Sequence, residues 1–387
     1  MKILITGSNG FVGKNLKVRL NEIKDGKDIT RKNINIEEIF EYNRNTENVL
    51  LEEYCKNADF IFHLAGVNRP IKKEEFMQGN VDFTKTLLNT LKNYHNTSPV
   101  LLASSIQASL EGRYKNSEYG LSKLKGEKLL FDYAKETNCK VLVYRFPNLF
   151  GKWCRPNYNS VIATWCNNIA HDLPIEVDDE NRILELVYID DLVEELLNVL
   201  ENKEHIKDNY GYVPISYKVT LKEIRDLLCN YRDQPNTLNI PELGNNTFSK
   251  RLYSTYLSYL PYEKASFALN MNIDDRGSFT EVFKTLNHGQ FSINISKPGV
   301  TKGNHYHHTK WEFFCVVSGK ARIEQRNIYN NEVYSFEVSS DRLECVHMIP
   351  GYTHSITNLS DNEDLVTLMW ANEVFNKDFP DTYYLEV

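Results

Sequence analysis

Short apolar runs alternate with longer amphipathic segments through the first half of the chain. The apolar runs of strand length are residues 2–6, 59–65 and 100–105, with a shorter piece at 39–42. Segments 14–23, 80–93 and 119–135 predict helices. This alternation of strand and helix fades after Tyr231.

The rest of the chain has a different pattern. Residues 232–249 hold two prolines, a glycine and two adjacent asparagines, which predicts a loop or linker. Apolar residues four positions apart predict a bridging helix over 251–260. Short strands separated by turn residues then indicate an all-β barrel or sandwich. These strands are 278–284, 289–296, 313–319, 321–328, 332–338, 344–349, 355–359 and 365–375. We therefore expect domains at 1–246 and 270–387, joined by a linker and bridging helix at 247–269.

Composition narrows the class of protein. A chain of 387 residues is long enough for two or three domains, and 41% hydrophobic with 25% charged residues is ordinary for a globular protein. The net charge of −7 argues against a nucleic-acid partner, which calls for a basic face. No stretch approaches the roughly 20 apolar residues of a membrane span, and the chain opens on a strand instead of a signal peptide. Seven scattered cysteines without a CxxC pair indicate reduced thiols. We expect a cytoplasmic protein with no membrane partner.

Three glycines lie between the first strand and the first helix with the spacing GxxGxxG. Glycines let the backbone approach a pyrophosphate, and the helix N-terminus supplies free N–H groups and a positive dipole. The pattern therefore predicts a dinucleotide site. The residues expected to contact the cofactor in this turn are Gly7, Asn9, Gly10, Phe11, Val12 and Gly13.

The end of the second strand bears on the choice of dinucleotide. An acidic residue there binds the 2′-hydroxyl of NAD, whereas a basic residue suits the 2′-phosphate of NADP. Strand 39–42 runs out towards Arg44 with no acid at its tip, so we expect NADP(H) and an Arg44 contact. Further cofactor contacts are expected where the next strand ends, at Leu64, Ala65 and Gly66.

Tyr119 and Lys123 begin a predicted helix and share one of its faces, because they are four residues apart. A nearby ammonium lowers the pKa of a tyrosine, so the phenol can exchange a proton with a carbonyl oxygen near neutral pH. A serine at the end of the preceding strand can hold the same oxygen. Ser105 is our candidate, with Ser104 as the alternative. Ser105, Tyr119 and Lys123 form the expected catalytic set, and Tyr119 and Lys123 are also expected to contact the cofactor.

These motifs, in this order, resemble the extended short-chain dehydrogenase/reductases, which are nucleotide-sugar reductases, epimerases and dehydratases. The matching segments are Thr6-Gly7-x-x-Gly10-x-x-Gly13, His63-Leu64-Ala65-Gly66, Ser104-Ser105, Tyr119-x-x-x-Lys123, Arg145-Phe-Pro-Asn148-Leu-Phe-Gly151 and Tyr188-Ile-Asp190-Asp191. The resemblance covers residues 1–245 or so. It implies a Rossmann-type, doubly wound parallel sheet that binds a nicotinamide cofactor. It also implies a nucleotide-sugar pocket after Gly151, with Arg155, Asn157 and Asn159 as contacts, and it matches Asn80 only loosely to the family's helix asparagine.

Four potential metal ligands lie in the all-β part. His305 and His307 are two residues apart, so on a strand they point to the same face. Glu312 can return on the next strand, and His354 lies further along the chain. Three imidazoles and a carboxylate on strands can close around a divalent cation such as zinc. We therefore expect these four residues to form a metal site.

Two segments around these ligands resemble the two cupin motifs and imply a jelly-roll β-barrel with the metal inside. They are Gly299-x5-His305-x-His307-x4-Glu312-x6-Gly319 and Pro350-Gly351-x-x-His354-x3-Asn358. Residues 274–281 also resemble the sugar-binding strand of the dTDP-4-keto-6-deoxyglucose 3,5-epimerase (RmlC) branch, which makes Arg276 an expected substrate contact. In that branch a histidine in an Arg-Gly-x-His segment is the free base. The matching segment here, 302–305, ends in the candidate ligand His305, so the base stays open between His305, His308 and Tyr306.

An extended reductase followed by an RmlC-like cupin is similar to the CapF-type enzymes of capsular polysaccharide synthesis, which act in UDP-N-acetyl-L-fucosamine production. The resemblance implies that the cupin epimerises C3 of a UDP-2-acetamido-2,6-dideoxy-4-hexulose. The reductase then reduces the C4 ketone of this UDP-sugar with NADPH, giving a 6-deoxy-talose product. Cupins often pair edge strands, so we expect a homodimer.

Two other interpretations stay open. The cupin can be a structural, metal-binding dimerisation module attached to a reductase with a single activity. Alternatively, the chain can be a non-enzymatic NADP sensor, although the complete Ser-Tyr-Lys set argues against a protein without turnover.

Overall fold

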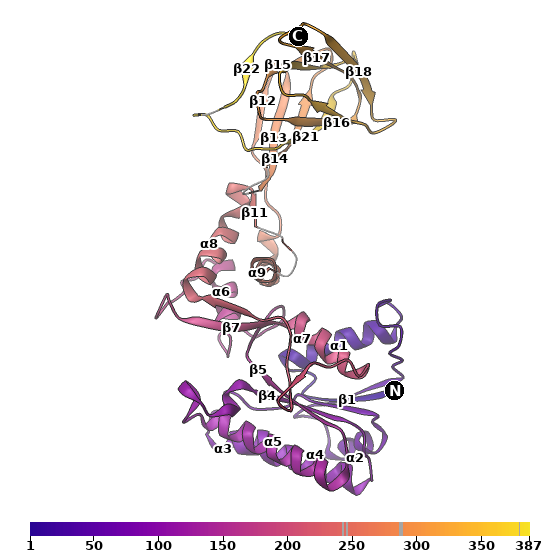
Figure 1. The fold of residues 1–387 in the computed structure, drawn as a ribbon, viewed down its shortest axis with the longest axis vertical. Coiled ribbons are helices and arrows are strands. Elements are labelled where there is room, and N and C mark those ends of the chain that lie inside the picture. Colours follow the sequence, from indigo (N-terminus) through magenta and orange to yellow (C-terminus); the bar gives the residue numbers. More distant parts are fainter. Residues whose placement is uncertain (242–243, 245–246, 286–288, 379) are drawn as a thin grey trace. The chain divides into compact units, whose positions relative to one another are not determined.

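The computed structural model describes residues 1–387 except 242–243, 245–246, 286–288 and 379. The described chain forms two compact units (Figure 1). The first comprises Met1–Cys229 and Arg251–Leu260, and the second comprises Asn230–Lys250 and Pro261–Val387. The domain boundaries 1–246, 247–269 and 270–387 stay a prediction, and residue 246 lies outside the described residues.

The first unit is built on a seven-stranded sheet in which β1 to β5 are parallel. Across the sheet its strands are β2 (Glu38–Tyr42), β1 (Lys2–Thr6), β3 (Phe60–His63), β4 (Val100–Ser105), β5 (Val141–Phe146), β9 (Tyr210–Gly211) and β8 (Ile206–Lys207). The strand order reverses direction at β1, which therefore ends at a topological switch point. Helices cover both faces, with α1 and α7 on one face and α2, α4 and α5 on the other (Figure 1).

Nine α-helices lie in the part of the chain that the structure describes. They are α1 (Phe11–Lys24), α2 (Asn48–Asn57), α3 (Glu74–Met77), α4 (Phe83–Asn93), α5 (Glu118–Thr137), α6 (Val161–Ala170), α7 (Ile189–Leu200), α8 (Leu221–Thr237) and α9 (Phe248–Leu257). A π-helical turn, Gln78–Asp82, leads into α4, where the sequence predicted one helix over 80–93. A smaller sheet contains β10 (Tyr217–Thr220), β7 (Ile183–Tyr188) and β6 (Asn148–Phe150). Among these residues no helix combines the length and the apolar character that crossing a bilayer requires.

The predicted linker at 232–249 is wrong over its first part. Helix α8 continues to Thr237 with Pro235 inside it. A proline removes one helical hydrogen bond, but near the end of a helix the loss is small, and the buried Tyr231 side chain donates from its hydroxyl to the Ser249 carbonyl oxygen at 3.0 Å. The predicted bridging helix begins earlier, at Phe248. The two adjacent asparagines of this stretch, 245–246, lie outside the described residues.

Two antiparallel sheets make up the β part of the second unit, as the barrel prediction requires. The first contains β11 (Asn239–Ile240), β13 (Gly277–Thr285), β14 (Gly289–Ser296), β21 (Leu365–Ala371), β16 (Glu312–Ser318) and β19 (Cys345–Met348), with β12 (Met271–Asp274) beside β13 and only the β11–β13 pair parallel. The second contains β18 (Val333–Ser339), β17 (Lys320–Asn327), β20 (Tyr352–Asn358), β15 (Thr301–Tyr306) and β22 (Tyr383–Tyr384). The two units confirm the predicted fold class, a Rossmann-type sheet followed by a cupin-type β-barrel.

Polar side chains occupy much of the barrel interior. On β14 every second residue is buried and polar, at Gln290, Ser292, Asn294 and Ser296. A half-buried strand normally turns apolar residues inwards. The apolar core is instead a separate cluster that includes Phe314, Ile323 and Ile356. A barrel with buried polar groups along one strand is suited to enclose a polar ligand.

Candidate functional site

The glycine turn packs against the segment that follows β3. Gly7 has a φ of +75°, and a Cβ there would lie 2.8 Å from Ala65. A Cβ on Gly13 would lie 2.3 Å from the Gly7 carbonyl oxygen. Both positions therefore exclude side chains. No side chain of the described residues caps the N-terminus of α1, so its first N–H groups are available to an anion such as a pyrophosphate.

The structure corrects one statement about the tip of β2. An acid does lie there, because Glu41 is the second-last residue of the strand and its carboxylate faces the glycine turn. Its Oε2 accepts hydrogen bonds from the Ser8 hydroxyl at 2.8 Å and from Lys17 Nζ at 3.0 Å. Arg44 lies beyond the strand with an exposed side chain. The predicted strand ended correctly at Tyr42, but only the residues beyond it were considered, so Glu41 inside the strand was missed.

Tyr119 and Lys123 lie on the first turns of α5, which Ser117 caps by accepting from the Gly120 N–H at 2.9 Å. Lys123 Nζ lies 5.9 Å from the centre of the Tyr119 ring and donates to the Ala103 carbonyl oxygen at 2.9 Å. Burial lowers the pKa of Lys123 to about 8, against an opposing effect of the Glu127 carboxylate. The two side chains share one helix face, as predicted from their spacing.

The expected lowering of the tyrosine pKa does not occur in this structure. Burial raises the pKa of Tyr119 to about 12, and the hydrogen bond with the Ser105 hydroxyl opposes this only in part. The Lys123 ammonium is turned to the Ala103 carbonyl oxygen instead of the phenol. Tyr119 is therefore a neutral phenol near neutral pH, which suits a proton donor.

The two adjacent serines at the end of β4 have different partners. Ser104 donates to Glu127 Oε1 at 2.5 Å, and the same carboxylate binds Arg145 through Nε at 2.9 Å. Ser105 is the hydrogen-bond partner of the Tyr119 phenol. Successive side chains of a strand point to opposite faces. Ser104 therefore points to Glu127, and Ser105 points to Tyr119. This geometry favours Ser105 over Ser104 as the serine of the set.

Asn80 connects the cofactor segment to the lysine. Its Oδ1 accepts from the Val67 N–H and its Nδ2 donates to the Val67 carbonyl oxygen, both at 2.9 Å. A Cβ on Gly66 would lie 2.8 Å from both Asn80 Oδ1 and Lys123 Nζ. Asn80 thus fixes the chain after β3 beside Lys123. The only sequence signal for this role was the loose family match.

The expected sugar contacts Arg155, Asn157 and Asn159 all have exposed side chains. The Arg155 guanidinium lies 5.3 Å from the centre of the Tyr158 ring. Tyr158, which the sequence pattern did not single out, lies close enough to Tyr119 to contribute to its raised pKa. This loop is therefore near the tyrosine through a residue other than those predicted.

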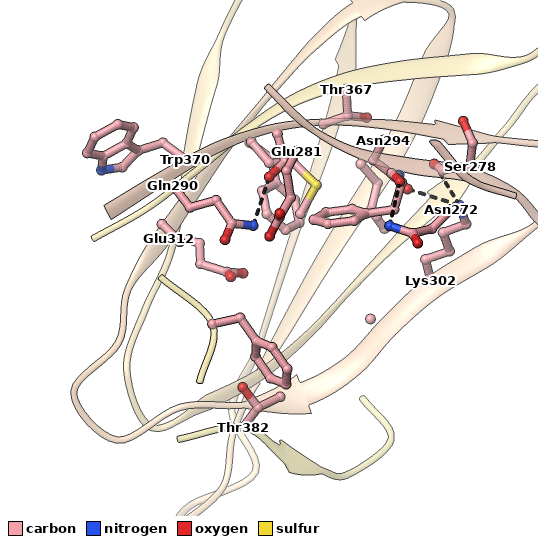
Figure 2. Close-up of a pocket in the computed structure, with 18 of the residues that line it drawn as sticks. Asn272, Ser278, Glu281, Gln290, Asn294, Lys302, Glu312, Thr367, Trp370 and Thr382 are labelled. Atoms are coloured by element: carbon pink, nitrogen blue, oxygen red, sulfur yellow. Dashed lines mark hydrogen bonds between the residues drawn. The ribbon is translucent and has the colours of Figure 1, made fainter. Parts of the chain in front are cut away.

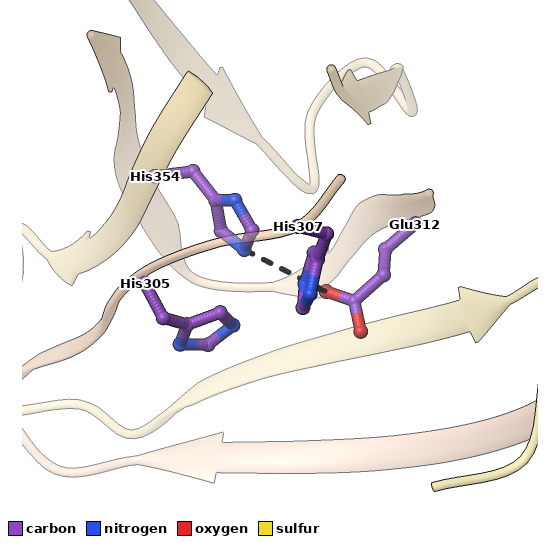
Figure 3. A group of neighbouring side chains, drawn as sticks. All are labelled: His305, His307, Glu312 and His354. Atoms are coloured by element: carbon purple, nitrogen blue, oxygen red, sulfur yellow. Dashed lines mark ion pairs between the residues drawn. The ribbon is translucent and has the colours of Figure 1, made fainter. Parts of the chain in front are cut away.

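The four predicted metal ligands come together inside the barrel (Figure 3). Their ligand atoms all lie within 4.8 Å of one another. His305 on β15 pairs in register with His354 on β20, and Glu312 begins β16. Glu312 Oε2 lies 3.6 Å from Nε2 of both His307 and His354. The structure thus assembles the cluster from both sheets.

The donor atoms of this cluster fit a divalent cation. Within the described chain, His307 Nε2, Glu312 Oε2 and both ring nitrogens of His354 are buried without a hydrogen-bond partner. Such burial is costly unless an ion binds these atoms. Burial lowers the pKa of His305 to about 4. Burial would raise the pKa of Glu312, but the His307 and His354 imidazoles outweigh it and hold this pKa well below its ordinary value. The neutral imidazole of His305 and the ionised carboxylate of Glu312 are the forms that bind metal.

A cavity of about 1050 Å³ opens beside the cluster (Figure 2). Its lining combines aromatic rings with polar groups and includes the cluster members His305, His307 and Glu312. Lys302 Nζ donates to Asn294 Oδ1 at 2.9 Å in the cavity wall, and burial lowers the pKa of this lysine. Gln290 Oε1 is buried with no hydrogen-bond partner among the described residues. The cavity therefore offers polar atoms to a ligand.

The remaining predicted residues of the barrel divide into two groups. Arg276 borders the cavity, with its guanidinium bonded to Asp274 Oδ2 at 2.6 Å. Tyr306 and His308 do not appear in the cavity lining, because their rings contact Tyr383 at centroid distances of 5.3 and 5.1 Å. Of the three candidate bases, His305 is the one at the cavity.

Two protein-family models match the chain, one in each of its two differently folded parts. Residues 3–213 match the NAD dependent epimerase/dehydratase family, and residues 272–383 match the polysaccharide biosynthesis C-terminal domain. A UDP-2-acetamido-2,6-β-L-arabino-hexul-4-ose reductase of Pseudomonas aeruginosa strain PA103 is 41% identical over 100% of this chain and 99% of its own length. A dTDP-4-dehydro-6-deoxyglucose reductase of Escherichia coli is 27% identical over 57% of this chain and 79% of its own length.

Among solved structures, the capsular polysaccharide assembling protein CapF of Staphylococcus aureus is 48% identical, with a TM-score of 0.89 and 100% of both chains covered. The similarity to it and to the Pseudomonas reductase thus extends through both units instead of stopping at the nucleotide-binding sheet. With both parts matched in the same order, this chain belongs to the CapF-type family of two-domain proteins, whose first part is an NAD dependent epimerase/dehydratase domain.

Proposed function

We propose that the chain is a bifunctional enzyme of nucleotide-sugar synthesis. The barrel epimerises C3 of a UDP-2-acetamido-2,6-dideoxy-4-hexulose, and the first unit reduces the C4 ketone with NADPH to a UDP-6-deoxy-talose-type sugar. The product serves UDP-N-acetyl-L-fucosamine and capsular polysaccharide synthesis. The full-length similarity to a UDP-2-acetamido-2,6-β-L-arabino-hexul-4-ose reductase supports this substrate class.

The reduction uses the Ser105, Tyr119 and Lys123 set. NADPH at the glycine turn supplies the hydride. Tyr119, which is protonated near neutral pH, donates its proton to the C4 oxygen as hydride transfer makes that oxygen basic. Ser105 holds the same oxygen. Lys17 neutralises Glu41 at the tip of β2 and Arg44 is exposed beyond it, which supports NADP(H) over NAD.

The observation that carries the second activity is the polar cavity that reaches the four-ligand cluster. A C4 ketone acidifies the C3 hydrogen because the carbanion delocalises as an enolate. A base at the cavity other than a metal-bound imidazole must take this proton, and an acid must return one to the opposite face of C3. His305, His307, Glu312 and His354 would hold a zinc ion, which supplies positive charge for an enolate oxygen. Lys302 and Gln290 line the same cavity, where they would face the sugar nucleotide. Reduction at C4 then preserves the new stereocentre, since the product no longer enolises.

A second candidate function is a reductase with a single activity and a structural, metal-binding cupin. The buried cluster favours it, because a metal there would stabilise the barrel in the absence of any reaction. The cavity of about 1050 Å³ that reaches the cluster favours the epimerase, since a structural module needs no such cavity. A His305→Ala, His307→Ala double variant that exchanges C3 deuterium normally would support the structural role. Turnover of NADPH with a 4-keto sugar nucleotide would exclude a pure NADP sensor.

Two further properties follow from the same proposal. The enzyme is a homodimer through an edge strand of the barrel, because β18 is an edge strand with Val333, Tyr334 and Phe336 exposed.

The enzyme is cytoplasmic, since all seven cysteines are free thiols, which suits a reducing compartment.

Replacing Tyr119 by phenylalanine separates the two activities. The substitution removes the proton donor, so we expect NADPH oxidation to fall by about 10²- to 10⁴-fold. Deuterium exchange at C3 of the 4-keto substrate, measured by mass spectrometry, should persist because the barrel is untouched. Loss of exchange in a folded Tyr119→Phe protein would contradict the division of labour.

The two serines of β4 provide a matched pair of variants. Ser105→Ala removes a hydrogen bond to the reacting oxygen and should lower turnover by about 10²-fold. Ser104→Ala removes a buried bond to Glu127 and should instead cost about 1.5–3 kcal/mol of unfolding free energy, with turnover largely kept. Steady-state kinetics and thermal unfolding distinguish the two, and the reverse pattern would assign the role to Ser104.

Zinc should copurify with the protein at about one ion per chain, as a closed four-ligand site predicts. His354→Ala removes a buried ligand and should lose the zinc, as measured by elemental analysis. His347→Ala, which changes an exposed histidine of the same unit, is the control and should keep it. Untreated wild-type protein without metal would refute the assignment.

A further inference from the structure

The cluster depends on the loop that joins two of its ligands. His307 and Glu312 are separated by residues 308–311, which connect β15 to β16. Lys310 in this loop is buried and lies 3.4 Å from Glu312. The side chains of His308 and Thr309 are exposed, so burial does not hold the first half of the loop in place. Yet His307 Nε2 must lie opposite Glu312 Oε2, at 3.6 Å, for the cluster to exist.

The carboxylate of Asp381 binds this loop. Its Oδ1 accepts from the His308 N–H at 3.0 Å, and its Oδ2 accepts from the N–H groups of Thr309 and Lys310, both at 2.9 Å. The Thr309 hydroxyl donates to the same oxygen at 3.0 Å. Burial would raise the pKa of Asp381, but these three amides outweigh it and hold the pKa well below its ordinary value. Three successive amides therefore converge on one ionised carboxylate.

The backbone of the same residue orients a ligand ring. The Asp381 carbonyl oxygen lies 2.6 Å from His307 Nδ1. A carbonyl oxygen can only accept, so Nδ1 carries a proton, and Nε2 is the nitrogen left to bind a metal. That Nε2 is the buried atom without a hydrogen-bond partner in the described chain. Asp381 has a φ of +36°, an uncommon conformation for a residue other than glycine, so its neighbours must hold it.

The residues after Asp381 are attached to the strand that carries His305. Tyr384 pairs with His305 and Tyr383 with Tyr306, forming β22 against β15. The Leu385 N–H donates to the Asn304 carbonyl oxygen at 2.9 Å. The position of Asp381 is thus set by β15, the strand that also positions the cluster.

We propose that Asp381 is the positioning residue of the metal cluster, with its carboxylate holding residues 308–310 and its carbonyl oxygen fixing the ring of His307. The inference rests on the proposed metal site and adds a residue 69 positions beyond Glu312. Partners that orient a ligand typically contribute about 10- to 100-fold to metal affinity.

The test compares Asp381→Asn with Asp364→Asn. The first keeps the size and the backbone, but it removes the negative charge and replaces one of the two oxygens that face three amides by an NH₂ group. The second changes an exposed carboxylate of the same unit, which pairs with Lys297 at 2.9 Å. Zinc affinity is measured by competition with a chromophoric chelator, and the visible spectrum of the cobalt-loaded proteins reports ligand geometry. We expect Asp381→Asn to weaken zinc binding about 10- to 100-fold and to alter the cobalt spectrum, whereas Asp364→Asn matches wild type.

Wild-type affinity and an unchanged cobalt spectrum in folded Asp381→Asn would overturn the inference and leave the proposed metal site standing. Failure of the wild-type protein to bind zinc would overturn both. Weaker zinc binding with undiminished C3 exchange would support the inference and oppose a catalytic role for the metal. Should Asp381→Asn fail to fold, hydrogen exchange of the wild type decides: the amides of 308–310 should be protected, and free exchange there would overturn the inference.

Discussion

An ionised carboxylate buried among imidazoles must be compensated, and Glu312 imposes this requirement on the whole barrel. An isolated buried charge costs several kcal/mol, which is a large part of a domain's stability. Lys310 Nζ lies 3.4 Å from the carboxylate and supplies one positive charge. The Nε2 atoms of His307 and His354 lie 3.6 Å from Oε2, where a bound cation would complete the compensation. This explains why the register of β15 against β20 matters, since it brings His305 opposite His354. A one-residue slip would turn these imidazoles out of the interior.

The first unit also buries charged side chains, Glu127 and Lys123, and the two differ in how fully they are paired. Glu127 is buried behind β4, where Ser104 and Arg145 bind it, so its charge is satisfied within the protein. Lys123 is also buried, but its ammonium has a carbonyl oxygen as partner and a lowered pKa. The ion pair of Glu127 with Arg145, together with the Ser104 hydrogen bond, holds β4, β5 and α5 together. Among the described residues, Lys123 has no carboxylate partner of this kind, so its ammonium is available to a ligand. The difference between structural and chemical roles here lies in how fully each charge is paired.

The spacing of residues close together in the sequence correctly predicted which of them lie together in the structure. The glycine turn, the Tyr119–Lys123 face and the His305–His307 pair all follow from the periods of helix and strand, and the structure brings each together. Features that depend on distant residues did not follow. Ser104 and Ser105 are equivalent until Glu127 is placed, and nothing near His307 in sequence points to Asp381. The pKa of Tyr119 was expected to fall, but burial, which spacing does not reveal, raises it. Likewise Pro235 did not end α8.

Chain order has a consequence for how the molecule is made. Every residue of the first unit precedes Pro261, whereas the cluster and Asp381 come from residues 305–381. Domains generally fold as units in the order in which they leave the ribosome. The nucleotide-binding sheet can therefore be complete on a nascent chain that has not yet produced His354. Until Asp381 has emerged, the loop after His307 lacks its proposed anchor, so the interior of the barrel would mature after the nucleotide-binding sheet.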